Sequence, residues 1–428
     1  MGLRILVAPN EDGLGTSAWT VRLVKGLLRA GAETIEAIRV PVASGRLANF
    51  HRGKYPGLPV EIMRLEGVRH PLRLVKQAGG VDIPATLAWC VLDYERSREE
   101  YRQALRACRA LDGADLLVDW GVPQMLRAAH DEAGRCGRRG RPLCVTVSDH
   151  AWSETLALMA HAAKLLGDRV VRGLQTMRAD EALTDCVFTF PPPITPAERE
   201  NYWRQTLHRP VERLPGVFGG HEVARRWAGG EPRPRIRRML GIPEDAAVLH
   251  LTGGGTPVWD RLLTSLLDEY AARPPSYYVV VFSPGERQRR GVRLGWSGGV
   301  QIGRDPGAPR VIHLGDVAGE THHVLFAAFD LVCTRAGGGT VSDALAFGVP
   351  LLLVEETGHP QVEAIRESCA NMGLARSVGL EEFLRSPRAQ LEGRTGELRA
   401  QPAPRMGVGC HAEEDLAARL LTLARAGR

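Results

Sequence analysis

Short apolar segments alternate with helical patterns along most of this sequence, and this alternation restricts the fold more than any other feature. In the first half, the apolar segments lie at residues 4–8, 116–119 and 143–148, and the helical patterns at residues 17–30, 123–134 and 152–166. Such alternation is typical of βαβ units, in which helices cover both faces of a parallel sheet. The first half is therefore predicted to form an α/β domain.

A second domain is predicted because the same alternation resumes further along the chain. Periodicity first weakens where proline, glycine and arginine accumulate, a composition typical of a linker. Strand patterns then return at residues 248–252, 277–283, 311–314, 330–334 and 351–354. A chain of 428 residues also exceeds what one hydrophobic core usually supports. We expect a first domain at residues 1–220, a linker at 221–240, a second domain at 241–410, and a C-terminal helix at 411–428 that could cross back to the first domain.

The formal net charge of +6 is carried mostly by arginine, with one cluster at Arg135, Arg138, Arg139 and Arg141. A basic chain can bind nucleic acid, an anionic membrane surface or phosphorylated ligands. The arginines are spread along the chain and are not interleaved with aromatic residues, as a groove for single-stranded nucleic acid requires. We therefore expect no nucleic-acid partner, and a solvated arginine-rich surface accounts for the cluster.

The eight cysteines form no Cys-x-x-Cys pair and have no spacing typical of metal ligands. The first residues run directly into an apolar strand pattern, without the regions of a signal peptide. No run of about 18 uninterrupted apolar residues occurs, so a transmembrane span is not expected. These observations favour a cytoplasmic protein with reduced thiols, and any membrane contact is expected to be peripheral, at the inner face of the cell membrane.

A glycine-rich turn is the strongest candidate for a binding site. It joins the predicted strand at residues 330–334 to a helix that begins near Thr340. The three successive glycines at 337–339 let the backbone approach a ligand closely. N–H groups at the start of a helix attract anions, and the helix dipole adds to this attraction. Asp343 lies one turn into the helix, where a carboxylate could accept hydrogen bonds from ribose hydroxyls. The segment therefore predicts a site for a nucleotide diphosphate.

The same segment resembles the nucleotide-sugar signature of GT-B glycosyltransferases. The resemblance is to the family of the lipid-II-forming N-acetylglucosaminyltransferase and the related diacylglycerol glycosyltransferases. In that family a basic or polar residue begins the turn, small residues follow, a Ser or Thr faces the phosphates, and an acid holds the ribose. These roles would fall here on Arg335, Gly337, Gly338, Gly339, Thr340 and Asp343. Asp343 stands where the family usually has Glu, which shortens the reach to the ribose.

The resemblance implies a GT-B fold, with two doubly wound, Rossmann-like parallel-sheet domains facing each other across a cleft. The first domain would bind the acceptor and the second the nucleotide-sugar donor. It also implies transfer of a hexosyl or N-acetylhexosaminyl group from a UDP-sugar to an acceptor hydroxyl. The UDP-sugar is a substrate, so no cofactor is expected. The acceptor would be lipid-linked or a small molecule such as a natural-product aglycone.

Two further segments of the second half are candidates for donor binding. A strand end opens into a second glycine turn, whose family counterpart faces the sugar diphosphate; its candidates are Thr252, Gly254, Gly255 and Thr256. Beyond the strand at 351–354, relatives carry an acid or polar residue and a glutamine that bind sugar hydroxyls. Here that segment contains Glu355, Glu356, His359 and Gln361, of which Glu356 and Gln361 are the main candidates. A plain tight turn and a solvated loop are the respective alternatives.

The general base is sought in the first half. The resembling families often have a histidine in the first strand-to-helix loop, but this chain has Thr16 there, with Asp12 nearby. A second candidate pair, Asp149 and His150, follows a predicted buried strand, and parallel sheets bind ligands at the carboxyl ends of their strands. Either side chain could take a proton from an acceptor hydroxyl. Helix capping is the structural alternative for Asp149.

Other catalytic signatures are absent from the sequence. There is no Gly-x-Ser-x-Gly elbow, Walker A loop, His-Glu-x-x-His motif or Asp-x-Asp run, so neither a metal site nor metal dependence is expected. Two alternatives remain open. The same architecture also occurs in nucleotide-sugar epimerases, which need no acceptor. The chain could also be a non-catalytic partner protein that kept the fold and lost the base, because Thr16 replaces the histidine.

Overall fold

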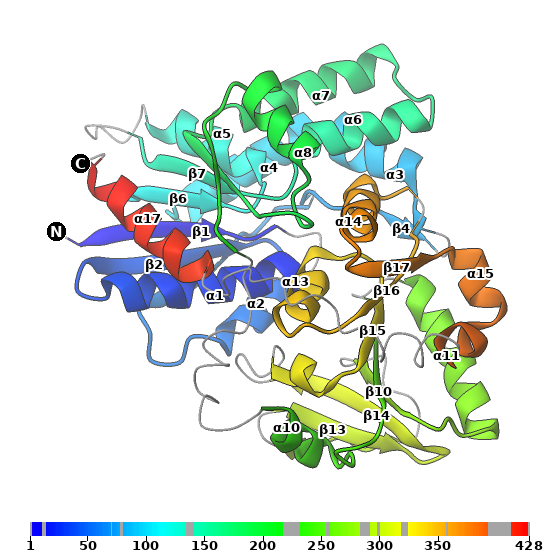
Figure 1. Ribbon diagram of the computed structural model, residues 1–428. Helices are drawn as coiled ribbons and strands as arrows, with labels where there is room; N and C mark the ends of the chain where they lie inside the picture. Colours follow the sequence, from blue (N-terminus) through cyan, green and yellow to red (C-terminus); the bar gives the residue numbers. More distant parts are fainter. Residues whose placement is uncertain are drawn as a thin grey trace.

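A computed structural model describes residues 2–10, 14–69, 71–77, 80–133, 141–216, 232–253, 257–282, 292–297, 300–317, 324–356, 358–392 and 412–426. It contains two α/β domains, each built around its own large sheet (Figure 1). The two-domain architecture predicted from the alternating pattern is therefore confirmed.

The first sheet has seven strands in the order β3-β2-β1-β6-β7-β8-β9, all parallel. Its strands are β1 (Leu3–Ala8), β2 (Ile35–Val42), β3 (Val60–Arg64), β6 (Leu116–Asp119), β7 (Leu143–Val147), β8 (Cys186–Thr189) and β9 (Val211–Arg213). Alternate residues of β1 enter different cores: Ile5 and Val7 pack in one, Leu6 and Ala8 in the other. Continuous apolar runs therefore form these strands because both faces of the sheet are covered.

Helices lie on both faces of this sheet. They are α1 (Leu14–Gly31), α2 (Gly45–Arg52), α4 (Tyr94–Ala107), α5 (Pro123–Ala133), α6 (Trp152–Ala162), α7 (Asp168–Glu181) and α8 (Ala197–Asn201), with π-helical turns at Ala88–Leu92 and Tyr202–Thr206. A short antiparallel pair, β4 (Lys76–Gln77) and β5 (Gly80–Val81), leads into α3 (Ile83–Leu87).

The second sheet has eight strands in the order β12-β13-β14-β11-β10-β15-β16-β17. They are β10 (Val248–Thr252), β11 (Tyr278–Phe282), β12 (Gly295–Ser297), β13 (Val300–Asp305), β14 (Ala308–Val317), β15 (Leu331–Thr334), β16 (Leu351–Val354) and β17 (Ala375–Val378). Six strands are parallel, whereas β12 and β13 extend one edge as an antiparallel meander. This edge was not predicted from the sequence. In the turn before β14, Asp305 accepts a hydrogen bond from the Gly307 amide (2.9 Å).

The second domain carries α10 (Pro232–Leu240), α11 (Pro257–Ala272), a 3-10 turn at Phe326–Ala328, α13 (Gly338–Ala346), α14 (Pro360–Asn371) and α15 (Leu380–Arg385). Residues 221–231 of the predicted linker lie outside the described residues. The rest of that linker forms α10, which the buried Arg237 ties to this domain through the Ala328 carbonyl (3.1 Å) and Asp330 (2.8 Å).

The last described helix, α17 (Ala412–Ala426), packs against α1 of the first domain (Figure 1). Two glycines of α1 permit this contact. A Cβ at Gly26 would lie 2.9 Å from the Glu413 carbonyl oxygen, and one at Gly31 would lie 2.7 Å from Leu421. The end of the chain thus returns to the domain in which the chain begins.

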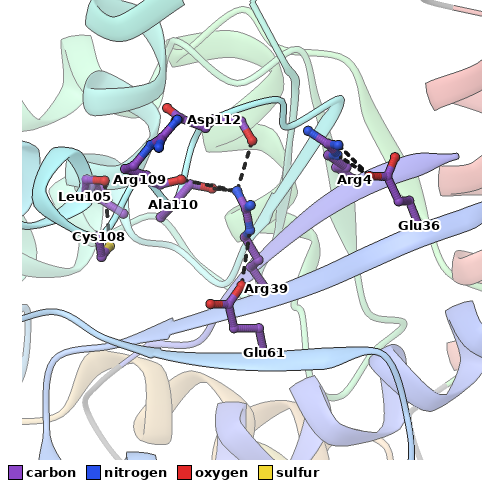
Figure 2. Close-up of polar contacts among 9 residues, drawn as sticks. All are labelled: Arg4, Glu36, Arg39, Glu61, Leu105, Cys108, Arg109, Ala110 and Asp112. Carbon is purple, nitrogen blue, oxygen red and sulfur yellow. Dashed lines mark hydrogen bonds and ion pairs between the residues drawn. The ribbon is translucent and has the colours of Figure 1, made fainter. Parts of the chain in front are cut away.

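Polar contacts tie together the strands and the connecting loop at the amino end of the first sheet (Figure 2). Arg39 of β2 donates to the carbonyls of Arg109, Ala110 and Asp112 at 2.9–3.2 Å, and its Nε lies 3.4 Å from Glu61. These contacts lie at the amino end of the sheet, whereas doubly wound sheets bind ligands at the carboxyl end. No described helix is both long and apolar enough to cross a membrane.

Candidate active site

Strand order reverses between β1 and β6 in the first sheet and between β10 and β15 in the second. Doubly wound domains bind ligands at the carboxyl ends of strands beside such a reversal. The helix that follows β15, α13, begins directly against the first domain. A Cβ at Gly338 would lie 3.3 Å from Trp19 of α1, 3.6 Å from Ile194 and 3.7 Å from Asp149 Oδ2. The two edges therefore meet at the start of α13.

The amino end of α13 has the properties of an anion site. Gly337 is the N-cap, and no described side chain caps the helix. The first bond of the helix runs from Val341 N to the Gly337 carbonyl (3.0 Å), and no described residue accepts from the amides of residues 338–340. A Cβ at Gly339 would meet nothing within 4 Å. These amides and this space can receive a phosphate group.

Asp343 lies on α13 as predicted, but its carboxylate faces the first domain. Its Oδ1 is 3.1 Å from Arg22 Nη2 of α1, and both side chains are buried. This carboxylate was predicted to bind a ribose, and its partner Arg22 was not predicted because no local pattern marks it. The ribose contact stays a prediction, and a bound ribose would share the Asp343 carboxylate with Arg22.

Arg335 and Glu356 form an ion pair at the carboxyl ends of β15 and β16, with Nη1 and Oε2 2.7 Å apart. Three other polar atoms here are buried without a hydrogen-bond partner among the described residues: Arg335 Nε, Glu356 Oε1 and His359 Nδ1. Burial and the nearby charges of Arg335, Lys76 and His150 hold the pKa of His359 well below its ordinary value. Buried unsatisfied groups of this kind are satisfied by a ligand or water, so the three atoms can bind hydroxyl groups.

Asp149 and His150 follow β7 and form a hydrogen-bonded pair, with His150 Nδ1 2.8 Å from Asp149 Oδ1. The Ser148 hydroxyl donates to the His150 carbonyl (2.7 Å), which fixes the loop. The other carboxylate oxygen of Asp149 accepts from the side-chain amide of Gln361 on α14. Burial alone would raise the pKa of Asp149, but the His150 charge and the hydrogen bonds from His150 and Gln361 outweigh burial and lower it. The geometry is that of a histidine oriented by a carboxylate.

Two buried carboxylates that were not predicted as site residues bind the elements on either side of this loop, β7 and α6. Asp119, at the end of β6, accepts from the Thr146 hydroxyl and the Val122 amide, both at 2.7 Å, and burial raises its pKa to about 6. Glu181 accepts from the Ser153 amide (3.1 Å) and hydroxyl at the start of α6, and burial raises its pKa to about 7. The position of Asp119 at the end of an apolar strand was a usable signal, whereas nothing in the local sequence distinguishes Glu181.

Aromatic side chains gather beside the same edge. Trp19 lies 4.5 Å from Phe190 and 5.7 Å from Trp120 between ring centroids, and all three are buried. The Trp152 ring lies 5.5 Å from the His150 ring. Apolar rings therefore form part of the surroundings of the Asp149–His150 pair.

The remaining candidates lie partly outside the described residues. Asp12 falls there, as do Gly254, Gly255 and Thr256. Thr252 ends β10 and pairs in register with Thr334, the residue before Arg335, so it lies beside the glycine-rich turn. Thr16, at the position where the resembling families have a histidine, donates its hydroxyl to the Asn10 carbonyl (3.0 Å). Across the described ranges, no three His, Cys, Asp or Glu side chains are grouped so that they could hold a metal ion.

The comparison with known proteins identifies the fold. No family model and no curated protein sequence matches the chain. Solved structures do match over its full length. CalG4, the calicheamicin glycosyltransferase, is 18% identical with a TM-score of 0.60, and covers 100% of this chain and 99% of its own. The glycosyltransferase of kitacinnamycin is 15% identical with a TM-score of 0.57, covering 100% and 97%.

A third match is a UDP-glucosyltransferase from Polygonum tinctorium, which is 14% identical with a TM-score of 0.53 and covers 98% of this chain and 99% of its own. Together with the two sheets and their facing edges, these matches define a two-domain protein of the GT-B fold, the fold of these glycosyltransferase structures. The narrower resemblance to the lipid-II-forming and diacylglycerol transferases stays a prediction.

Proposed function

We propose that the protein transfers a sugar from a UDP-sugar donor to an acceptor hydroxyl. One observation carries this proposal. A Cβ at Gly338, in the first turn of α13, would lie 3.7 Å from Asp149 Oδ2. An anion-binding helix terminus of one domain therefore adjoins a hydrogen-bonded acid–base pair of the other. Glycosyl transfer needs both in one place, because a diphosphate leaves as an acceptor loses a proton.

The donor would lie along the second domain. Its diphosphate would bind the amides of residues 338–340, with Arg335 and the helix dipole stabilising the leaving charge. This positive potential is the reason to propose transfer without a metal ion. The unsatisfied atoms of Glu356 and His359 would bind hydroxyls of a hexose or N-acetylhexosamine. A UDP-linked donor is supported by the glycine-rich signature and by the Polygonum tinctorium structure, whose protein is named a UDP-glucosyltransferase.

His150 is the proposed general base. Its Nδ1–H donates to Asp149, which leaves Nε2 as the nitrogen that can accept a proton. The acceptor oxygen attacks the anomeric carbon, its proton passes to Nε2, and the bond from that carbon to the diphosphate oxygen breaks. Asp149 orients the imidazole and stabilises the imidazolium that forms. The base selected among the sequence candidates is thus His150, with Asp149 as its partner.

An apolar acceptor with a free hydroxyl fits the first domain. The aromatic residues around Trp19 and Trp152 make the edge beside His150 apolar. Calicheamicin and kitacinnamycin, named in two of the similar structures, support a natural-product acceptor. A lipid-linked acceptor, reached by peripheral contact with the inner face of the membrane, is the second acceptor class to test.

The test measures UDP release from UDP-glucose and UDP-N-acetylglucosamine. One arm adds a panel of aromatic aglycones, a second adds lipid extract, a third adds EDTA, and a fourth omits any acceptor. We expect release that depends on an acceptor and persists in EDTA. Loss of activity in EDTA would overturn metal independence alone. Isomerisation of the sugar without acceptor would show an epimerase, and failure to bind any nucleotide-sugar would remove the enzymatic proposal.

A further inference from the structure

The carboxylate of Asp149 is held from both sides of the interface between the domains. His150, its neighbour in the chain, binds Oδ1 at 2.8 Å, and Gln361, which is 212 residues away in sequence, donates its amide to Oδ2. Asp149 is only 7% exposed, so water cannot replace a lost partner freely. The donor domain therefore supplies one of the two hydrogen bonds that fix this carboxylate.

A second contact holds the same turn of α14. Arg199 of α8 donates to the carbonyl of Pro360 at 3.3 Å, and its other terminal nitrogen lies 3.0 Å from Glu154. Pro360 is the first residue of α14 and directly precedes Gln361. The first domain thus contacts both the backbone beside Gln361 and the Gln361 side chain.

The chain enters α14 through a turn that the first domain also contacts. Gly358 has φ of 77°, a conformation that favours glycine, and its amide donates to Glu363 at 3.1 Å. A Cβ at Gly358 would lie 3.5 Å from Ile83 and 3.6 Å from the Val81 carbonyl. The next residue is His359, whose Nδ1 is one of the unsatisfied atoms of the donor site. One short turn therefore connects the donor site with the carboxylate that orients His150.

We propose that Gln361 is a positioning residue that aligns Asp149 with His150 when the donor domain lies against the first domain. This inference rests on the proposed function and replaces the sugar contact expected for Gln361. With Oδ2 held by an amide, the carboxylate keeps Oδ1 on Nδ1–H and the imidazole keeps one tautomer. Without that amide the carboxylate can rotate, and the base loses its orientation. Proton removal is thereby coupled to the presence of the donor domain.

The test compares Gln361→Ala and Gln361→Glu with the wild type. Gln390→Ala is the matched control, because Gln390 also donates to a carboxylate, Glu382, at 2.9 Å, but on the exposed surface of the same domain. For Gln361→Ala we expect kcat to fall by about tenfold to a hundredfold, the range for outer-shell hydrogen-bond partners. The donor KM and the dissociation constant for UDP should change less than about threefold, and Gln390→Ala should match the wild type.

Gln361→Glu separates positioning from mere packing. It places a second carboxyl group beside Asp149, and two adjacent carboxylates share a proton and repel when both ionise. We expect this variant to show a pH–kcat profile displaced from that of the wild type, whereas Gln361→Ala keeps the wild-type shape at lower height. If a Gln361 variant instead raises the donor KM and leaves kcat unchanged, Gln361 binds the sugar and the inference is overturned.

A readout independent of turnover separates this inference from the proposed function. In protein labelled with ¹⁵N-histidine, with the His150 signal assigned by its loss in His150→Gln, the wild type should show the Nδ1–H tautomer, and Gln361→Ala a tautomer mixture. If Gln361→Ala shows the tautomer mixture but the wild type transfers no sugar, the positioning role is sustained and glycosyl transfer is refuted. An unchanged tautomer in an enzyme that transfers sugar would overturn the positioning role alone.

Discussion

The carboxyl edges of the two sheets face each other, but different kinds of polar group line them. The edge of the first sheet carries buried side chains: Asp119, Asp149 and His150 among aromatic rings. The edge of the second carries the backbone amides of residues 338–340 and the Arg335–Glu356 ion pair. Side-chain acids and bases in a dry place suit proton transfer, whereas backbone donors suit an anion whose charge is the same in every nucleotide-sugar. The first edge is therefore suited to proton transfer, and the second edge to binding an anion.

The largest effect is expected at the first edge. Asp149→Asn keeps the shape of the side chain but removes the charge that orients His150 and stabilises its imidazolium. We expect kcat to fall by roughly 10²–10⁴-fold, while the dissociation constant for UDP stays near that of the wild type. Steady-state kinetics and calorimetric UDP titration measure both quantities. Asp168→Asn, an exposed change on α7, is the control, and full turnover of Asp149→Asn would move the base elsewhere.

The contact between the edges is tested at Asp343. Asp343→Ala removes one ion-pair partner of the buried Arg22 guanidinium, a carboxylate oxygen 3.1 Å away. Breaking a buried pair in this way costs about 3–5 kcal/mol of stability. Urea unfolding measures the loss, and the double change Arg22→Met with Asp343→Ala should recover part of it. Weaker UDP binding by the stable double variant would support the ribose contact, and unchanged affinity would exclude it.

The buried carboxylate of Glu181, near the first edge, should make the stability of the protein depend on pH. Burial raises the pKa of Glu181 from about 4.5 to about 7, so its stabilising contribution is complete below about pH 4.5 and is lost as pH rises through 7. Glu181→Gln removes this dependence. The stability of the variant relative to the wild type should rise by about 2–3 kcal/mol between pH 5 and pH 8.

Urea titrations at several pH values measure this difference for Glu181→Gln and for Glu198→Gln, an exposed change on α8. The control should show no such trend. A parallel pH dependence of wild type and Glu181→Gln would mean that Glu181 titrates in the folded protein as it does in the unfolded chain.

The smallest effect on stability is expected at the second edge. Gly339→Ala adds a methyl group where nothing lies within 4 Å, in the first turn of a helix. Replacing a helical glycine by alanine should raise stability by about 0.5–1 kcal/mol. The same methyl enters the space proposed for the diphosphate, so UDP affinity should fall. Gly53→Ala, which also adds a methyl in open space, is the control, and undiminished UDP affinity in Gly339→Ala would place the diphosphate elsewhere.

Much of the fold was predictable because it depends on local patterns. The strand predicted at residues 351–354 is β16 (Leu351–Val354), and that at 248–252 is β10 (Val248–Thr252). Continuous apolar runs bounded by glycine or proline leave few alternatives once both faces of a sheet are buried. The antiparallel edge formed by β12 and β13 was not predicted, since residues 295–305 lack a strong period of either kind.

The members of the candidate site were selected one by one, each from its position at the end of a strand or the start of a helix. Their partners could not be selected in this way. Arg22 and Asp343 are 321 residues apart, and Gln361 and Asp149 are 212 apart. Glu181 stands at the end of a helix with nothing in its surroundings to mark it as a cap for another one.

The sequence by itself determined that the chain forms two α/β domains and that a glycine-rich turn opens a helix near residue 340, which begins at Gly338 in the structure, because periodicity and backbone freedom act over a few neighbouring residues. Only the tertiary structure decided which side chains meet at that turn. Hydrogen bonds and ion pairs depend on distances of about 3 Å, and such distances between Asp149, Gln361, Arg22 and Asp343 are set by the packing of two domains against each other. The glycine-rich turn proposed to bind the diphosphate is therefore local in the sequence, whereas the proposed orientation of His150 depends on the contact between the two domains.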